Sequence, residues 1–147
     1  MKFRSFALLI LLLAGEPRLV LADTLLVVGD SLSAAYGIPV DHGWVSLLQQ
    51  QLAAEQYPCT IINASISGDT TANARARLPE TITRHRPAIV ILELGGNDGL
   101  RGLSLAAMKD NLAAMITAVQ QAGAELLLIG VELPPNYGTH FTDKFRA

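Results

Sequence analysis

The stretch Thr24–Gly37, TLLVVGDSLSAAYG, ends an apolar run abruptly at Gly29-Asp30-Ser31 and continues with small and polar residues. Two interpretations fit this pattern. The run is a buried strand that ends in a loop, with Ser31 capping the next segment, or the strand presents Ser31 as a nucleophile at the edge of a sheet. An isolated Gly-Asp-Ser favours the cap, so the loops after the other strands have to decide between them.

Three further apolar runs recur along the chain. They are TIINA (60–64), AIVILEL (88–94) and ELLLIGV (125–131). Runs of this kind are typical of strands that are buried on both faces, as in a parallel sheet. We therefore expect four such strands.

The segments between these runs have the spacing of helices. One apolar face follows Gly43 and includes Trp44, Leu47, Leu48 and Leu52. The Ala/Arg-rich segment 70–86 is also helical in pattern, although Pro79 argues against one continuous helix. The clearest helix has apolar residues three and four apart from Leu105 to Val119, with a cap at Ser104 and a stop at Gly123. This alternation predicts a doubly wound α/β fold in a single domain.

Polar, glycine-rich loops come after all four expected strands. They are Gly29-Asp30-Ser31, NASISGDT (63–70), GGND (95–98) and LPPNYG (133–138). Ligands of parallel sheets bind beyond the carboxyl ends of the strands. Because these loops would converge on one rim, a shared site is favoured over four unrelated turns.

Three residues of this rim match the needs of acyl transfer. Ser31 is the candidate nucleophile, and a turn into a helix N-terminus would favour negative charge beside it. Gly68 would offer a backbone N–H and Asn97 a side-chain amide to a tetrahedral oxyanion. The simpler alternatives stay open at this point, with Ser31 as a helix cap and the two glycine-containing loops as ordinary turns.

Other residues near the rim are interpreted as structural. Asp30 and Asp98 are expected to brace loops through backbone hydrogen bonds, and Glu93, inside the third run, is expected to be structural. Cys59 is the single cysteine, so it cannot form an internal disulfide and is expected to be a buried, inert thiol.

Composition argues against several kinds of partner. The 147 residues are 50% hydrophobic and 16% charged, with a net charge of −2, and they hold no basic patch, which argues against nucleic acid as a partner. The three histidines, His42, His85 and His140, lack the spacing of metal ligands. No phosphate-binding glycine motif occurs. We expect neither a metal nor a cofactor.

The N-terminus has the pattern of a secretory leader over residues 1–22. Lys2 and Arg4 precede the apolar stretch SFALLILLLA (5–14), and a small residue, Ala22, stands at the expected cleavage site. The mature chain would start near Asp23 and be periplasmic or secreted. An uncleaved anchor or a buried first helix is the alternative, although the apolar stretch is too short to span a bilayer alone.

Together the loops resemble the SGNH/GDSL hydrolase superfamily, and in particular its exported bacterial thioesterase and lysophospholipase branch. The segments that carry the resemblance, in order, are VVGDSLSAAYG, NASISGDTTANARARLP and ELGGNDGLRG. The resemblance runs from about Asp23 to the end. It implies a flavodoxin-like three-layer α/β/α fold, with Ser31 as nucleophile and the Ser31 N–H, the Gly68 N–H and the Asn97 side chain as the oxyanion hole.

The resemblance also implies substrates and partners. Acyl-CoA thioesters, lysophospholipids and simple aryl esters would be hydrolysed by a monomer without metal, cofactor, nucleic acid or stable membrane anchor. The residues expected to contact substrate are Asp30, Leu100, Leu103, Pro134 and Tyr137. Ordinary core packing is the alternative for the apolar ones.

One part of the family pattern is not found. The superfamily takes its general base from an Asp-x-x-His motif, and this sequence has none. Residues 23–147 are therefore expected to form a hydrolase domain that lacks its last strand and helix, hydrolyses esters feebly and leaves the fourth strand uncovered. A non-catalytic module that binds acyl chains or carbohydrates, or an acetyl-sugar esterase, stays open as an alternative.

Overall fold

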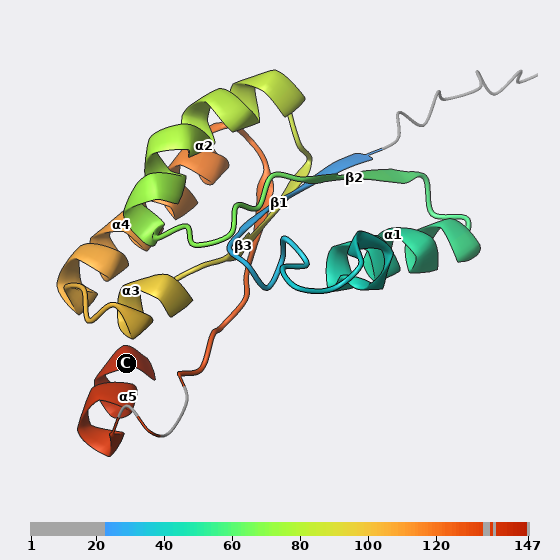
Figure 1. Cartoon of the computed structure of the whole chain (residues 1–147). Coiled ribbons are helices and arrows are strands. Elements are labelled where there is room, and N and C mark those ends of the chain that lie inside the picture. Colours follow the sequence, from blue (N-terminus) through green and yellow to red (C-terminus); the bar gives the residue numbers. More distant parts are fainter. Residues whose placement is uncertain (1–22, 134–135, 137, 147) are drawn as a thin grey trace, which may run out of the picture.

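The chain folds around a parallel sheet with helices on both faces. The structure, a computed structural model, describes residues 23–133, 136 and 138–146 (Figure 1). The strands are β1 (Asp23–Gly29), β2 (Cys59–Asn63), β3 (Ile89–Glu93) and β4 (Glu125–Leu128). The helices are η1 (Val40–His42, a 3-10 turn), α1 (Trp44–Ala54), α2 (Thr71–His85), α3 (Gly96–Leu100), α4 (Leu105–Gln121) and α5 (Thr139–Arg146).

The strand order is β2-β1-β3-β4, and every neighbouring pair is parallel. The chain adds β2 on one side of β1, and then β3 and β4 on the other. The order therefore reverses between β1 and β3, and this switch point is where sheets of this type bind ligands. The doubly wound α/β prediction is confirmed.

The core lies in two layers, one on each face of the sheet. Leu26 and Val28 of β1 point to the face that α2 and α4 cover, together with Leu78, Met115 and Val119. Leu25 and Val27 point to the opposite face, which α1 covers through Val45, Trp44 and Leu48. Figure 1 shows this division, with α2 and α4 on one side of the strands and α1 on the other. The expected three-layer arrangement is confirmed.

The expectation that all four strands are buried on both faces is right only for the central pair. β1 and β3 are almost wholly buried, whereas no residue of β2 is fully buried and β4 exposes most of its side chains. β4 also ends at Leu128, three residues before the end of the predicted run. An edge strand has a neighbour on one side only, so apolar sequence there does not guarantee burial.

The helices correct the sequence interpretation at one point and support it at two. α2 is continuous through Pro79, although an interior proline costs about 3 kcal/mol. Leu78 and Ile82 of α2 are buried, and this packing holds the helix together around the proline. The Ser104 hydroxyl caps α4 by accepting the Ala107 N–H at 3.3 Å, and Gly123, with φ of 77°, ends it as predicted. The short helices α3 and α5 were not predicted.

Two further expectations concern the ends and the thiol. Among the described residues, no helix is both long and apolar enough to cross a bilayer. The leader predicted over residues 1–22 lies outside the described residues. Cys59 is half-buried at the start of β2 rather than fully buried, and burial raises the pKa of its thiol, which disfavours the reactive thiolate.

Candidate active site

Ser31 lies just beyond the end of β1, in a turn rather than at the start of a helix. The Ala34 N–H donates to the Asp30 carbonyl at 2.9 Å, and the Tyr36 N–H donates to the Ser31 carbonyl at 3.1 Å. These two bonds close a turn that is not continued, since the next helical residues begin at Val40. The predicted helix N-terminus beside Ser31 is therefore wrong. The N–H groups of a helix that begins at Ser31 are therefore not available to stabilise negative charge there.

Asp30 ties the first loop to the third. Its carboxylate is buried and accepts two hydrogen bonds, one from the Leu32 N–H at 3.0 Å and one from Asn97 Nδ2 at 3.0 Å. The first bond confirms the expected bracing of the loop. A contact of Asp30 with substrate stays a prediction, since both carboxylate oxygens already have donors inside the protein.

Gly68 occupies a tight turn beside the end of β1. The Asp69 N–H donates to the Ile66 carbonyl at 3.1 Å, and Gly68 has φ of +84°, a conformation that glycine adopts without strain. The Ile66 N–H donates to the Gly29 carbonyl at 3.0 Å, which fixes this turn against β1. Among the described residues the Gly68 N–H has no acceptor, so it is available to a ligand.

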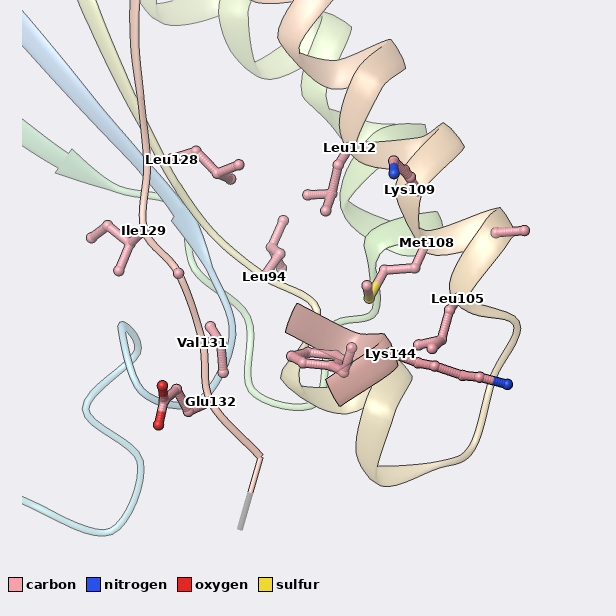
Figure 2. Close-up of a pocket in the computed structure, with 13 residues that line it drawn as sticks. Leu94, Leu105, Met108, Lys109, Leu112, Leu128, Ile129, Val131, Glu132 and Lys144 are labelled. Carbon is pink, nitrogen blue, oxygen red and sulfur yellow. The ribbon is translucent and has the colours of Figure 1, made fainter. Parts of the chain in front are cut away.

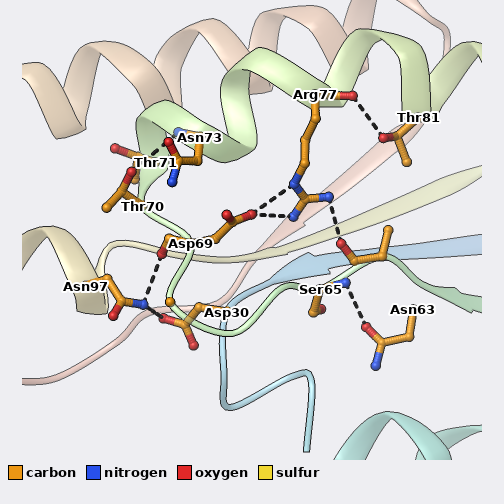
Figure 3. Close-up of polar contacts among 12 residues, drawn as sticks. Asp30, Asn63, Ser65, Asp69, Thr70, Thr71, Asn73, Arg77, Thr81 and Asn97 are labelled. Carbon is orange, nitrogen blue, oxygen red and sulfur yellow. Dashed lines mark hydrogen bonds and ion pairs between the residues drawn. The ribbon is translucent and has the colours of Figure 1, made fainter. Parts of the chain in front are cut away.

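Asn97, the second residue of α3, connects all three loops. Its Nδ2 donates to Asp30 Oδ2 and to the Asp69 carbonyl, both at 3.0 Å (Figure 3). The structure thus brings the neighbours of Ser31 and Gly68 onto one amide. Both amide hydrogens have acceptors, so Asn97 can serve an oxyanion only by sharing or releasing one of these bonds.

A further set of polar contacts, which sequence reasoning missed, holds the loops from behind. Arg77 of α2 contacts Asp69 through two nitrogens, at 2.9 and 2.7 Å, and donates to the Ala64 carbonyl at 2.7 Å (Figure 3). Asp98 accepts both the N–H and the hydroxyl of Thr71, at 2.9 and 2.6 Å, which confirms its bracing role. The only sequence signal for these contacts was a charge of each sign near the loops.

Glu93 ends β3 and is 4% exposed. Its Oε2 accepts the Ser33 hydroxyl at 2.7 Å, and Trp44 Nε1 donates to the same hydroxyl at 3.2 Å. Burial raises the pKa of Glu93, the charge of Asp30 raises it further, and the bond from Ser33 opposes them. Glu93 is structural in the sense expected, and it reaches the loop that carries Ser31.

The histidines do not provide a base in the described structure. His42 is exposed, and its contact is with the adjacent Asp41 at 3.9 Å. His85 ends α2 and so lies near the start of β3, at the opposite ends of the strands from the rim loops. The side chain of His140 lies outside what the structure describes. Of the described side chains, none donates to or accepts from the Ser31 hydroxyl.

Of the apolar residues expected to contact substrate at the rim, the structure describes two. Leu100 and Leu103 are both exposed, so core packing is the wrong explanation for them. Pro134 and Tyr137 lie outside the described residues. Other large apolar side chains are exposed in the first and second loops, among them Leu32, Tyr36, Ile38 and Ile66. The rim therefore offers apolar surface to a ligand.

An apolar groove lies away from these rim residues. It measures about 700 Å³ and opens between α4, β4 and α5, where Leu94, Met108, Leu112 and Leu128 point into it (Figure 2). Ser31, Gly68 and Asn97 are not among its lining residues. Within the described residues, no three of the His, Cys, Asp and Glu side chains gather closely enough to hold a metal ion.

The rim thus combines a serine at the switch point with backbone and amide N–H groups from the neighbouring loops, and acyl transfer uses groups of these kinds. A sequence profile of the GDSL-like lipase/acylhydrolase family matches residues 27–147, and the chain belongs to this family. It is 52% identical over 141 residues to the esterase TesA of Pseudomonas aeruginosa, covering 92% of this chain and 70% of that protein. It is 44% identical over 126 residues to thioesterase 1/protease 1/lysophospholipase L1 of Escherichia coli, covering 86% of this chain and 59% of that protein.

The fold agrees with this assignment. A crystal structure of TesA superposes with a TM-score of 0.82 at 53% identity, over 84% of this chain and 68% of that one. The resemblance drawn from the three sequence segments, including its thioesterase and lysophospholipase branch, is confirmed. The chain spans less than two thirds of the length of the Escherichia coli relative.

Proposed function

We propose that this protein hydrolyses acyl esters and thioesters, with Ser31 as nucleophile and the Ser31 N–H, the Gly68 N–H and the Asn97 amide as oxyanion donors. The observation that carries the proposal is the convergence of three loops on Asn97 at the β1–β3 switch point. The family assignment and the names of the two relatives support the reaction class.

The chemistry is derived from these groups. Ser31 Oγ attacks the carbonyl carbon and gives up its proton to a base, while the carbonyl oxygen gains negative charge that the N–H donors stabilise. The C–O or C–S bond then breaks, and an alcohol or thiol leaves with a proton. Water hydrolyses the acyl group from Ser31. The exposed Leu100 and Leu103 are proposed to contact the acyl chain, together with Asp30, Pro134 and Tyr137.

The expected rate of the 147-residue chain is low. The described side chains place no base against Ser31, and serine–base units are strongly non-additive, so the serine alone retains little of the rate. Esters with a good leaving group, such as aryl esters, depend least on the missing proton transfer. We propose thioesters of CoA and lysophospholipids as further substrates.

Location and assembly belong to the same proposal. We propose that residues 1–22 are removed on export, and that the mature hydrolase domain from Asp23 is a periplasmic or secreted monomer that binds neither nucleic acid nor a membrane stably. Mass determination of the chain recovered from a bacterial periplasm tests this. An intact Met1 would contradict the leader.

A fluorophosphonate probe tests the nucleophile. We expect slow covalent labelling of Ser31, located by mass spectrometry, together with slow release of p-nitrophenol from p-nitrophenyl butyrate. Ser31→Ala should abolish both. Ser65→Ala is the matched control, because it deletes a hydroxyl in a rim loop that has no hydrogen-bond partner among the described residues. Labelling that persists in Ser31→Ala would contradict the proposal.

One observation favours a second candidate. Both amide hydrogens of Asn97 already have acceptors within the protein, and no described base contacts Ser31. A module that binds acyl chains or carbohydrates without turnover would need neither of these groups to be free. Saturable binding of a fluorescent fatty acid or of an acetylated sugar, with no labelling of Ser31, would favour that module over the hydrolase. An acetyl-sugar esterase would instead label and release acetate.

A further inference from the structure

Ser33, two residues beyond the proposed nucleophile, is held by three separate elements. Its hydroxyl donates to Glu93 Oε2 of β3 at 2.7 Å and accepts from Trp44 Nε1 of α1 at 3.2 Å. Its carbonyl accepts from Asn63 Nδ2 of β2 at 2.7 Å. Side chain and backbone are therefore both fixed, and Ser33 is almost wholly buried.

The end of β1 is shaped around this contact. A Cβ placed on Gly29 would lie 2.6 Å from Ser33 Oγ and 3.0 Å from Glu93 Oε2. The first distance is shorter than any that a real Cβ adopts, so only glycine leaves room for the hydroxyl to reach the carboxylate. Gly29 in the Gly-Asp-Ser sequence is thus needed for close approach, not for an unusual φ.

The buried contact between Ser33 and Glu93 is not explained by a gain in stability. Glu93 is buried, and its Oε1 has no hydrogen-bond partner among the described residues. Asp30 on the neighbouring strand end is the charged group that acts on Glu93, and it repels the carboxylate. From the turn, the neutral Ser33 hydroxyl donates to Glu93, and Trp44 of α1 donates to that hydroxyl rather than to Glu93 itself. A buried carboxylate without a cation lowers stability, so its benefit has to lie elsewhere.

We propose that Ser33 and Glu93 are positioning residues, which anchor the turn at residues 30–36 so that Ser31 is held in place for attack. The turn has few internal bonds, three among residues 30–36, and all of them end at Asp30 or Ser31. Ser33 lies close to both of those residues and ties their backbone to β2, β3 and α1 at once. The role in attack rests on the proposed function, whereas the anchoring itself does not.

Hydrogen–deuterium exchange tests the anchor without requiring activity. Ser33→Ala should accelerate exchange of the Ala34 and Tyr36 amides about tenfold or more, because a buried hydrogen bond to a charged group is lost. Ser65→Ala deletes a hydroxyl without a described partner and should leave the turn unchanged. Exchange in α2 and β3 should stay as in the parent chain. An unchanged turn in Ser33→Ala, with circular dichroism showing a folded chain, overturns the inference.

Trp44→Phe and Glu93→Gln guard against a variant that fails to fold. Trp44→Phe keeps an aromatic ring but removes the outer donor, and Glu93→Gln keeps an acceptor but removes the charge, so each should loosen the turn less than Ser33→Ala. Trp44 is the only tryptophan, and its emission should shift in Ser33→Ala because its acceptor is gone. Equal turn exchange in all three variants and the parent overturns the inference.

Labelling kinetics separate positioning from ligand binding. In Ser33→Ala the maximal rate of fluorophosphonate labelling should fall about tenfold, while the half-saturating probe concentration stays constant. A parent chain that does not label at all contradicts the proposed function, and the exchange result then decides the anchor by itself. A change confined to the half-saturating concentration contradicts positioning.

Discussion

The centre and the β4 edge of this sheet show opposite outcomes for similar sequence. Along β1 and β3, apolar runs are buried on both faces, and the loops after them are fixed by polar contacts that converge on Asn97 and Ser33. Along β4, an equally apolar run is half exposed and borders an apolar groove. Hydrophobicity is similar in both regions. What differs is the number of neighbouring strands, and burial depends on that number.

Leu92 and Leu128 give the sharpest test of this contrast, because they are register partners on β3 and β4. Leu92 is 0% exposed and Leu128 is 43% exposed. Leu92→Ala should lower the free energy of unfolding by about 2–5 kcal/mol, since it leaves a cavity in a packed core. Leu128→Ala should cost less than about 1 kcal/mol. Urea denaturation measures both, and equal losses would mean that β4 is as well covered as β3.

Arg77 and Arg84 test whether an ion pair beside the rim loops contributes more to stability than an exposed pair of the same charge. Both lie on α2 and pair with a carboxylate, but the Arg77–Asp69 pair is largely buried while Arg84–Glu80 is largely exposed. Arg77→Met should cost about 2–3 kcal/mol, because Asp69 is left unpaired. Arg84→Met should cost at most about 0.5 kcal/mol. Similar values from urea denaturation would show that burial does not strengthen the inner pair.

The raised pKa of Glu93, at the end of β3, leads us to expect that stability depends on pH. Because burial raises its pKa in the folded chain above the ordinary 4.5, the folded chain holds this proton to higher pH than the unfolded chain does. The stabilisation that comes from this proton is fully present below pH 4.5, the ordinary pKa. It is lost as the pH rises through the raised pKa of the folded chain. Glu93→Gln should flatten this part of the stability profile between acidic and neutral pH. A profile identical to that of the parent chain would show that Glu93 does not titrate as described.

The smallest effect on folding is expected at exposed positions, where the consequence is association. Leu127 on β4 and Leu47 on α1 are 53% and 51% exposed. Either one changed to Lys should alter the free energy of unfolding by about 0.5 kcal/mol or less. Only Leu127→Lys should reduce concentration-dependent association, since a charge on an edge strand blocks pairing between chains. Light scattering distinguishes the two, and an equal effect of both would make general hydrophobicity the cause.

The sequence was sufficient for the strands, the loops and the family, because each depends on local pattern. Ser31, Gly68 and Asn97 stand next to strand ends, and strand ends in a parallel sheet meet at one rim. The supporting contacts were not predictable in this way. Ser33 and Glu93 are separated by 60 positions, and no periodicity relates them. Trp44 was assigned to an apolar helix face, which is right for its ring and says nothing of its N–H.

The same limit explains the wrong predictions. Pro79 was judged by local geometry, whereas the packing of Leu78 and Ile82 decided the outcome. The expected helix after Ser31 failed because Ala35 adopts φ of 56°, a left-handed conformation that ends a helical turn and that no sequence rule assigns to alanine. The exposure of β4 depends on what lies beside it, and a run of leucines carries no information about that.

The amide of Asn97 has a consequence for the timing of any reaction at this rim. It joins the first loop to the second, and it is also a proposed donor to the transient oxyanion. Whatever recruits this amide to a ligand weakens the link between Asp30 and Asp69 by the same free energy, because linkage is reciprocal. Each turnover would therefore briefly weaken the contact of Asn97 with Asp30 and Asp69. Mutations that strengthen this contact would slow the reaction.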